Sequence, residues 1–236
     1  MFFSYSFSEA CNGGVDALVM AAENGELLDV QLLLGCSNID VNDVDGRQRT
    51  PLYAASRAGN VEVVKELRKD ENLQINKAVE PNVAPLIIAS RKGYKEVVKE
   101  FLLDARVDPN IQDSNGVTPL WTASGRGHAE VVRELLLDAR VDPNIQDNDG
   151  RTSIWMATSM RKMEAVELLL RCPRVDITIK DATKDATPLD LATKNGFVNL
   201  NGDGFASAIQ SRSTLLDEGH SCAQEQGDIL SLQCLE

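Results

Sequence analysis

The sequence has few of the residues on which most catalytic and metal sites depend. It contains only two histidines, His128 and His220, and none of its five cysteines forms a Cys-x-x-Cys pair. No serine or cysteine stands in a recognisable nucleophile motif, and no glycine-rich phosphate-binding loop is present. The cysteine spacing indicates neither a disulfide framework nor a zinc site, so we expect free thiols in a reducing compartment. We therefore expect no enzymatic activity, no cofactor and no metal ion.

Long apolar runs are also absent, and aromatic side chains are few. No apolar segment approaches the roughly 20 residues that a helix needs to cross a bilayer. Residues 1–9 lack a basic region followed by a sustained apolar core, so we expect no cleaved signal peptide. Aromatic residues make up 5% of the chain and hydrophobic residues 43%, which favours thin helical layers packed through leucine, valine and alanine. We expect an intracellular, cytoplasmic protein, with the nucleus as an alternative.

Positive charge is scarce across the chain. The 36 acidic residues outnumber the 24 basic residues, and the formal net charge is −12. Nucleic acids and anionic membranes repel such a chain unless its cations gather on one face. We therefore expect neither nucleic acid nor membrane as a partner, and a filter-binding assay without salt-dependent retention would exclude nucleic acid.

What the sequence does contain is an internal repeat of 34 residues. Residues 102–113 and 136–147 have the same twelve letters, LLDARVDPNIQD.

The same step links four ladders of small or apolar residues. The leucine ladder contains Leu18, Leu52, Leu86, Leu120, Ile154 and, after one inserted residue, Leu189. The alanine ladder contains Ala21, Ala55, Ala89, Ala123, Ala157 and Ala192. The glycine ladder contains Gly25, Gly59, Gly93, Gly127 and Gly196, interrupted by Arg161, and the valine ladder contains Val30, Val64, Val98, Val132 and Val166. A fixed period of this length predicts units that stack on their neighbours.

Each repeat carries signals for two helices and a turn. Thr-Pro pairs at 50–51, 118–119 and 187–188 place a hydroxyl N-cap before a proline at the first helical position. The ladder glycine ends this short helix, and an apolar stripe such as that of residues 130–136 predicts a second helix. Asp-Pro-Asn and Asn-Gly or Asp-Gly sequences then predict an extended turn. The third repeat has Ala84 in place of the capping threonine, and the shifted glycine in residues 45–49 predicts an irregular second turn.

These residues resemble the ankyrin repeat family. The likeness rests on Gly116-Val117-Thr118-Pro119-Leu120, Ala123, Gly127-His128, Val131-Val132 and Leu135-Leu136, and it covers about residues 16–200. The resemblance implies an all-α solenoid of helix-turn-helix units with β-turn fingers. It also implies a groove, formed by the fingers and the first helices, that binds partner proteins. The period is 34 rather than about 33.

The family's histidine after Thr-Pro-Leu is replaced throughout, so we expect its hydrogen bond to be missing in every repeat. The replacements are Tyr53, Ile87, Trp121, Trp155 and Asp190. We expect a lead-in at 1–15, repeats at 16–46, 47–80, 81–114, 115–148 and 149–183, and a partial repeat at 184–200. We expect a weakly ordered tail at 201–236, with a helix over 229–232 as the alternative.

Several groups of surface residues are candidates for partner binding. Basic residues at the ends of successive first helices are Arg57, Arg91, Lys92, Arg126, Arg161, Lys162 and Lys194. A stripe of this kind suits an acidic peptide, although cations at a helix carboxyl end are also favourable without any partner. Finger-tip candidates are Arg47, Arg49, Ser114, Asn115, Val117, Asn148, Asp149 and Arg151, for which turn chemistry alone is the alternative.

Two further patterns have structural explanations that we favour. Trp121 and Trp155 are possible interface residues, but their place at the base of a finger favours partial burial between repeats. The ladder Asn42, Asn76, Asn110 and Asn144, with Asp108 and Asp142 nearby, is interpreted as holding the turn backbone rather than a metal ion.

The sequence thus predicts a monomeric, non-catalytic scaffold that binds another protein through the groove and the finger tips. The alternative is a regulatory or targeting fragment of a larger multidomain protein or enzyme. An effector domain encoded in frame after residue 200 would favour that alternative.

Overall fold

The computed structural model describes residues 14–79 and 82–194. Within these residues there are eleven α-helices, and the β-structure is limited to an isolated antiparallel bridge between Val79 and Val83. The chain divides between Ser114 and Asn115 into two compact units, and each is described by itself. The tail 201–236, the end of the partial sixth repeat and the alternative helix at 229–232 lie outside the described residues.

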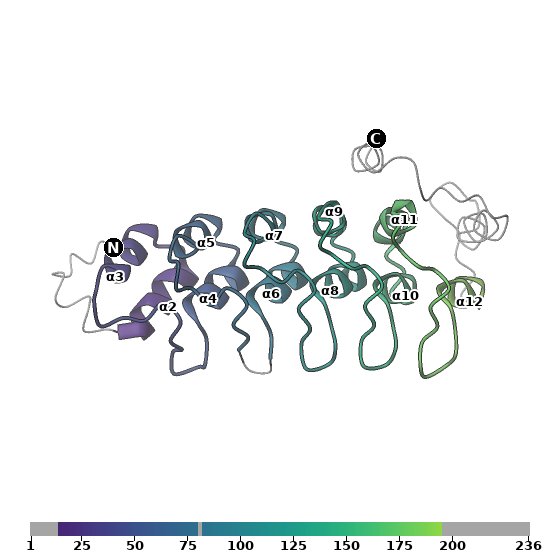
Figure 1. Cartoon of the computed structure of the whole chain (residues 1–236), viewed down its shortest axis with the longest axis horizontal. Helices are drawn as coiled ribbons and strands as arrows, with labels where there is room; N and C mark the ends of the chain where they lie inside the picture. The colour runs from purple at the N-terminus through teal and green to yellow at the C-terminus, as the bar shows by residue number, and fades with distance from the viewer. Residues whose placement is uncertain (1–13, 80–81, 195–236) are drawn as a thin grey trace. The chain divides into compact units, whose positions relative to one another are not determined.

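The first unit contains three helix pairs. These are α2 (Gly14–Asn24) with α3 (Leu27–Leu34), α4 (Pro51–Ala58) with α5 (Val61–Leu67), and α6 (Pro85–Lys92) with α7 (Lys95–Leu102). The first helix of each pair packs against the next first helix, and the second helices α3, α5 and α7 form a neighbouring row (Figure 1). Two layers of short helices thus enclose one core.

The second unit repeats this arrangement. It contains α8 (Pro119–Arg126), α9 (Ala129–Leu137), α10 (Ser153–Ser159), α11 (Met163–Arg171) and α12 (Pro188–Lys194). Helix α10 packs between α8 and α12, and α11 packs against α9. The long finger loops project from the first-helix side, away from α9 and α11 (Figure 1).

The residue ladders form the core of both units. From Leu18 to Ile154 the leucine ladder is at most 2% exposed, whereas Leu189 is half-buried. The alanine ladder is at most 4% exposed and the valine ladder at most 1%. Because alanine ends at its Cβ, neighbouring first helices can pack closely. The positions that recur every 34 residues in the sequence are therefore the buried positions of the fold.

The glycine ladder marks the end of the first helices. Gly25, Gly59, Gly93 and Gly127 have φ between 77° and 83°, a left-handed conformation that glycine adopts without steric cost. Arg161 stands at the same position and also has a positive φ, 57°. A residue with a Cβ pays about 1–2 kcal/mol for this conformation. The repeat geometry therefore overrides the local preference of Arg161.

The first helices are capped by threonine where the sequence provides it. The hydroxyls of Thr50 and Thr118 each accept a hydrogen bond from the backbone N–H three residues later, at 3.1 Å, and Thr152 does so at 3.4 Å. Ala84 has the same extended backbone conformation, with φ −75° and ψ 156°, but provides no side-chain cap. The third repeat, which has no threonine at this position, therefore also lacks the N-cap hydrogen bond in the fold.

Replacing Ala84 with threonine should raise the free energy of unfolding by about 1 kcal/mol, the usual value of an N-cap hydroxyl. The position is 1% exposed, but threonine fits at the equivalent Thr50 and Thr118, which are each 3% exposed. Urea denaturation measures the change. Ala84→Val is the matched control, because it adds the same volume without the hydroxyl. Equal effects of the two variants would show that the hydroxyl makes no cap.

The second finger is regular, so the expectation of an irregular turn was wrong. The N–H of Asp45 donates to the Arg49 carbonyl at 3.0 Å, as the N–H of Asp147 does to the Arg151 carbonyl at 3.0 Å. Gln48 has φ 59° at the position where the later finger has Gly150 with φ 77°. The turn is thus kept at the cost of a strained glutamine, because its hydrogen bonds and the neighbouring repeats fix the backbone.

Within each unit, the asparagine ladder ties a turn to the next repeat. In the first unit, Asn42 donates to the Asn72 carbonyl at 3.0 Å and accepts from the Gln74 N–H at 2.7 Å. In the second unit, Asn144 donates to the Arg174 carbonyl at 2.8 Å and accepts from the Asp176 N–H at 2.7 Å. These bonds confirm the structural interpretation of the ladder.

The cysteines differ from the expectation of free thiols. Cys172 is buried and is not in a disulfide, but Cys36 is disulfide-bonded, and its partner lies outside the described residues. The expectation was wrong for Cys36 because sequence spacing alone does not show which cysteines approach one another. Of the helices that the structure describes, none is long and apolar enough to span a membrane.

Candidate functional site

Two of the finger-tip candidates point inward. Arg49 is 8% exposed; its guanidinium pairs with Asp45 and with Glu23, each at 2.7 Å. Val117 is also 8% exposed. Neither side chain is placed to meet a partner. Arg47, Ser114 and Asn115 are exposed at their tips.

The Asp45–Arg49 pair holds the second finger together electrostatically. Burial alone would raise the pKa of Asp45, but hydrogen bonds from the side chain and backbone of Arg49 outweigh it, and the pKa lies below its ordinary value. Burial alone would lower the pKa of Arg49, but its hydrogen bonds to Asp45 and Glu23 outweigh burial, and the pKa lies above its ordinary value. Both groups are therefore charged at neutral pH, and their role is structural.

In the first unit, the basic residues at the helix ends are mostly paired. Arg57 forms an ion pair with Glu23 at 3.4 Å, and Arg91 pairs with the buried carboxylate of Asp113 at 3.5 Å. Lys92 is exposed and forms no ion pair with any described residue. Only Lys92 of this group thus offers an uncompensated charge.

In the second unit, the helix-end cations are more available. Arg126 is exposed, and the Lys162 side chain lies against the next residue of the chain, because a Cβ on Gly127 would be 2.8 Å from Cδ of Lys162. No ion pair to either side chain is formed within the described part of the chain. Arg161 is exposed and Lys194 is exposed at the end of α12. Arg126 is the last residue of α8 and Lys162 is the N-cap residue of α11, so both cations stand at helix ends of the second unit.

The finger bases of the second unit contain a stack of two tryptophans and one arginine. The Arg151 guanidinium carbon lies 5.8 Å from the ring centres of both Trp121 and Trp155. Arg151 also pairs with Asp147, whose side chain is 0% exposed, at 2.7 Å, and with exposed Asp149 at 2.6 Å. Such cation–π contacts stabilise by about 0.5–2 kcal/mol each. The stack fixes the finger base.

The two tryptophans are not equivalent. Trp155 is 5% exposed, and its indole N–H donates to the Ala186 carbonyl at 3.2 Å. The hydrogen bond of the family's histidine was expected to be missing in every repeat, and at this position Trp155 bonds instead to the next finger. Trp121 is half-buried, and its indole nitrogen has no hydrogen-bond partner within the described residues. Partial burial between repeats, the interpretation we favoured, is confirmed for Trp121, which packs against Trp155, and Trp155 is buried more completely than expected.

Backbone hydrogen bonds join the fingers of the second unit. The N–H of Asn148 donates to the Asn115 carbonyl at 3.0 Å, and the N–H of Ala182 donates to the Asp149 carbonyl at 2.9 Å. The side chains of Asn115, Asn148 and Asp149 are nevertheless exposed. These fingers therefore present polar tips on a fixed backbone.

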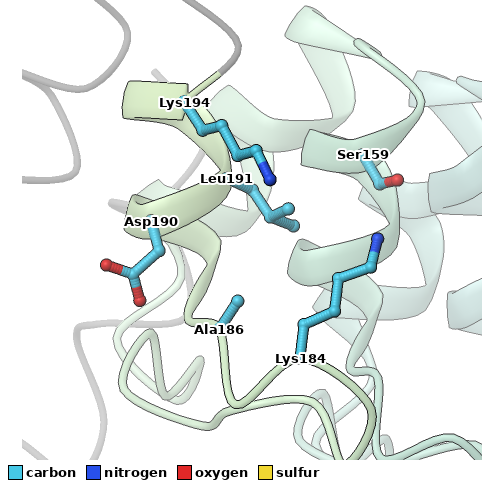
Figure 2. Close-up of a pocket in the computed structure, with 6 residues that line it drawn as sticks. All are labelled: Ser159, Lys184, Ala186, Asp190, Leu191 and Lys194. Atoms are coloured by element: carbon cyan, nitrogen blue, oxygen red, sulfur yellow. The ribbon is translucent and has the colours of Figure 1, made fainter.

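A pocket of about 380 Å³ lies beside these fingers, between the end of α10, the last finger and α12 (Figure 2). It is lined by Ser159, Lys184, Ala186, Asp190, Leu191 and Lys194. Lys184 was absent from our sequence candidates. It lies in the finger that carries the one-residue insertion, so the 34-residue step gave no equivalent position.

The comparisons with known proteins agree with this geometry. A family model for ankyrin repeats, containing three copies, matches residues 4–80 and 86–181, which is more than half of the chain. The chain belongs to the ankyrin repeat family. The crystal structure of EF0377, an ankyrin repeat protein, matches this ankyrin chain with a TM-score of 0.72 and 27% sequence identity, and the match covers 85% of this chain and 97% of that one. A search of curated proteins found no match.

The all-α ankyrin fold expected from the resemblance is thus confirmed. Ankyrin repeats are generally protein-interaction modules.

Acid should unfold this ankyrin chain only at low pH. Hydrogen bonds from the Arg106 side chain, opposed by burial, lower the pKa of Asp104, and those from Arg140 do the same for Asp138. Since the folded pKa lies below the unfolded value of about 3.9, the stabilisation is complete above that pH and disappears as the pH falls through the folded value. Urea midpoints should therefore stay constant from about pH 7 to 5 and fall below about pH 4.

The matched control for this prediction is Asp104→Asn, which should be less stable than wild type at neutral pH and show a shallower acid decline. A loss of stability between about pH 7 and 5 would contradict the assignment, because these aspartates do not titrate there.

Proposed function

We propose that this ankyrin chain is a non-catalytic module that binds a partner protein, and that the second unit supplies the binding surface. The observation that carries the proposal is the row of finger tips with Asn115, Asn148 and Asp149 exposed on a hydrogen-bonded backbone. A surface that is already ordered loses little conformational entropy on binding. Such fingers suit recognition of a folded or extended protein segment.

The helix-end cations support an acidic partner segment. Arg126 and Lys162 have no ion-pair partner within the described residues and are set in a chain whose net charge is −12. A local positive site on an acidic protein steers acidic ligands and discourages other orientations. Arg47, Lys92, Ser114 and Arg161 remain secondary candidates. Arg49, Arg57, Arg91 and Val117 are left out because they are buried or paired, and Arg151 contributes by holding the finger base.

A pull-down with matched charge reversals tests this proposal. The test bait carries Arg126→Glu at the end of α8 and Lys162→Glu at the N-cap of α11. The control bait carries Arg133→Glu and Arg171→Glu on the second helices α9 and α11, so both variants change the net charge equally. We expect capture of the wild-type partner to fall about tenfold or more with the test bait and to persist with the control.

Equal capture by wild type and the test bait, or loss confined to the control bait, would overturn the choice of surface. Circular dichroism melts of all three proteins verify that each bait is folded.

We also propose that the chain acts as a monomer inside the cell, in the cytoplasm or the nucleus. The Cys36 disulfide argues against a cytoplasmic or nuclear location, because disulfides are rare in cytosolic proteins. Alkylation of Cys36 in cells lysed directly into denaturant, before and after reduction, decides the question, because the residue is buried in the folded protein. Modification without reductant supports an intracellular location, and modification only after reduction contradicts it. Light scattering on the purified chain measures the oligomeric state.

A further inference from the structure

The pocket beside the last finger is lined by two lysines, Lys184 and Lys194. Figure 2 shows the side chains of Lys184 and Lys194 pointing into the pocket toward Ser159, one from the finger and one from the end of α12. The carboxylate of Asp190 points away from them (Figure 2). The open space of about 380 Å³ is large enough for a few side chains of a ligand.

Nearby acidic groups are engaged elsewhere. Asp190 accepts hydrogen bonds from the N–H and the hydroxyl of Thr187, at 2.8 and 2.7 Å, and thereby completes the start of α12. Asp185 pairs with Lys180 at 2.8 Å. Within the described residues, neither Lys184 nor Lys194 forms an ion pair. The pocket lining thus carries two positive charges and the one negative charge of Asp190, and its net charge is positive in an otherwise acidic chain.

The floor of the pocket is apolar. Leu191 is 7% exposed and packs with Trp155 and Met156, while the methyl group of Ala186 lies at the side. Ser159 lines the far wall (Figure 2). Two ammonium groups and an aliphatic floor are complementary to a carboxylate that stands next to an aliphatic side chain.

We propose that this pocket binds an acidic peptide segment of a partner protein, with a carboxylate between Lys184 and Lys194 and a neighbouring leucine-like side chain over Leu191. The inference rests on the proposed function and adds which kinds of side chain the bound segment carries. A peptide fits better than a nucleic acid, because a polyanion is repelled by a chain of net charge −12 whereas a single carboxylate needs only the local site.

Fluorescence anisotropy with a labelled peptide tests the site on the full-length protein. The probe is a twelve-residue peptide with a central Leu-Leu-Asp-Glu, and the matched probe has Leu-Leu-Asn-Gln in its place. We expect the acidic probe to bind about tenfold or more tightly than the amide probe at low salt, and the difference to shrink as salt screens the charges.

Variants locate the binding. Lys184→Gln with Lys194→Gln should weaken the acidic probe about tenfold, because the stems remain and the charges are lost. Lys180→Gln is the matched control: it lies on the same finger but pairs with Asp185 outside the pocket, and it should bind as wild type does. Equal binding of the two probes, or an unchanged affinity of the double variant, would overturn the proposal.

Carbodiimide cross-linking then identifies the occupant. We expect Lys184 or Lys194 to become joined to the aspartate or glutamate of the probe. The chain itself contains Leu215-Leu216-Asp217-Glu218, and a cross-link from the pocket lysines to these residues of the same chain would overturn the partner assignment. If the partner is captured equally by wild type and the pocket variant, this inference fails while the proposed function, which is tested at Arg126 and Lys162, stands.

Discussion

Replacing Trp155 with alanine is expected to lower the free energy of unfolding by about 3–5 kcal/mol, the usual cost of removing a buried tryptophan from a core. The ring is 5% exposed and packs with Met156 and Leu191. Its N–H also holds the carbonyl of Ala186 at 3.2 Å. Truncation would therefore leave a cavity between α10 and α12 and release the last finger, so the pocket lysine on that finger would be displaced as well.

Urea denaturation followed by far-ultraviolet circular dichroism measures this loss. Trp121→Ala is the matched control, because its ring is half-buried and its indole nitrogen has no partner among the described residues. We expect a clearly smaller effect there. Trp155→Phe should cost about 1 kcal/mol of hydrogen bonding plus the loss of part of the ring contact. A Trp155→Ala effect below that of Trp121→Ala would contradict the packing described for α10 and α12.

The second large effect is expected from Asp147. Replacing it with alanine should lower the free energy of unfolding by about 2–4 kcal/mol, since a partly buried arginine and two backbone N–H groups lose their acceptor. The Asp147 carboxylate is 0% exposed, pairs with Arg151 at 2.7 Å, and accepts from the N–H groups of Asp149 and Arg151 at 3.0 and 2.9 Å. Arg151 would then be held between the two indole rings by Asp149 alone.

Asp149→Ala is the control for Asp147→Ala. Its side chain is 51% exposed and forms an ion pair with the same arginine at 2.6 Å, so its removal should cost no more than about 1 kcal/mol. The same urea titration compares the two variants. Similar losses would show that the buried carboxylate contributes no more than a surface ion pair, and the finger would not depend on it.

The fold follows from the sequence because each repeat buries the same positions. Residues such as Leu120, Ala123 and Val132 recur at one spacing, and all three are at most 1% exposed. Helix ends were predictable for a related reason, since Thr118-Pro119 and Gly127 are local signals that act through the backbone. These features depend on neighbours in the sequence or one repeat away.

The site was harder to predict because it depends on side-chain direction. Arg49 and Arg47 are two residues apart in one finger, yet one is buried in ion pairs and the other is exposed. A signal for this was present: Asp45-x-x-x-Arg49 recurs as Asp147-x-x-x-Arg151, a spacing that lets an arginine fold back on a turn aspartate. The bond from Trp155 to Ala186 had no such signal, because it joins two fingers through a side chain absent from most repeats.

Lys184 could not be found from the period. The inserted residue in the last finger shifts Lys184 out of register with the earlier repeats. Lys184 and Lys194 line the same pocket only because this finger packs beside α12. Sequence ladders therefore locate a core more reliably than they locate a pocket formed by an irregular loop.

Hydrogen–deuterium exchange of the full chain, with and without its captured partner, tests the central claim most directly. The account predicts that the partner slows exchange at the finger segments 115–116, 148–149 and 182–186 and at the ends of α8, α10 and α12. Slowed exchange confined to the second helices α9 and α11, or to the first unit, would contradict it.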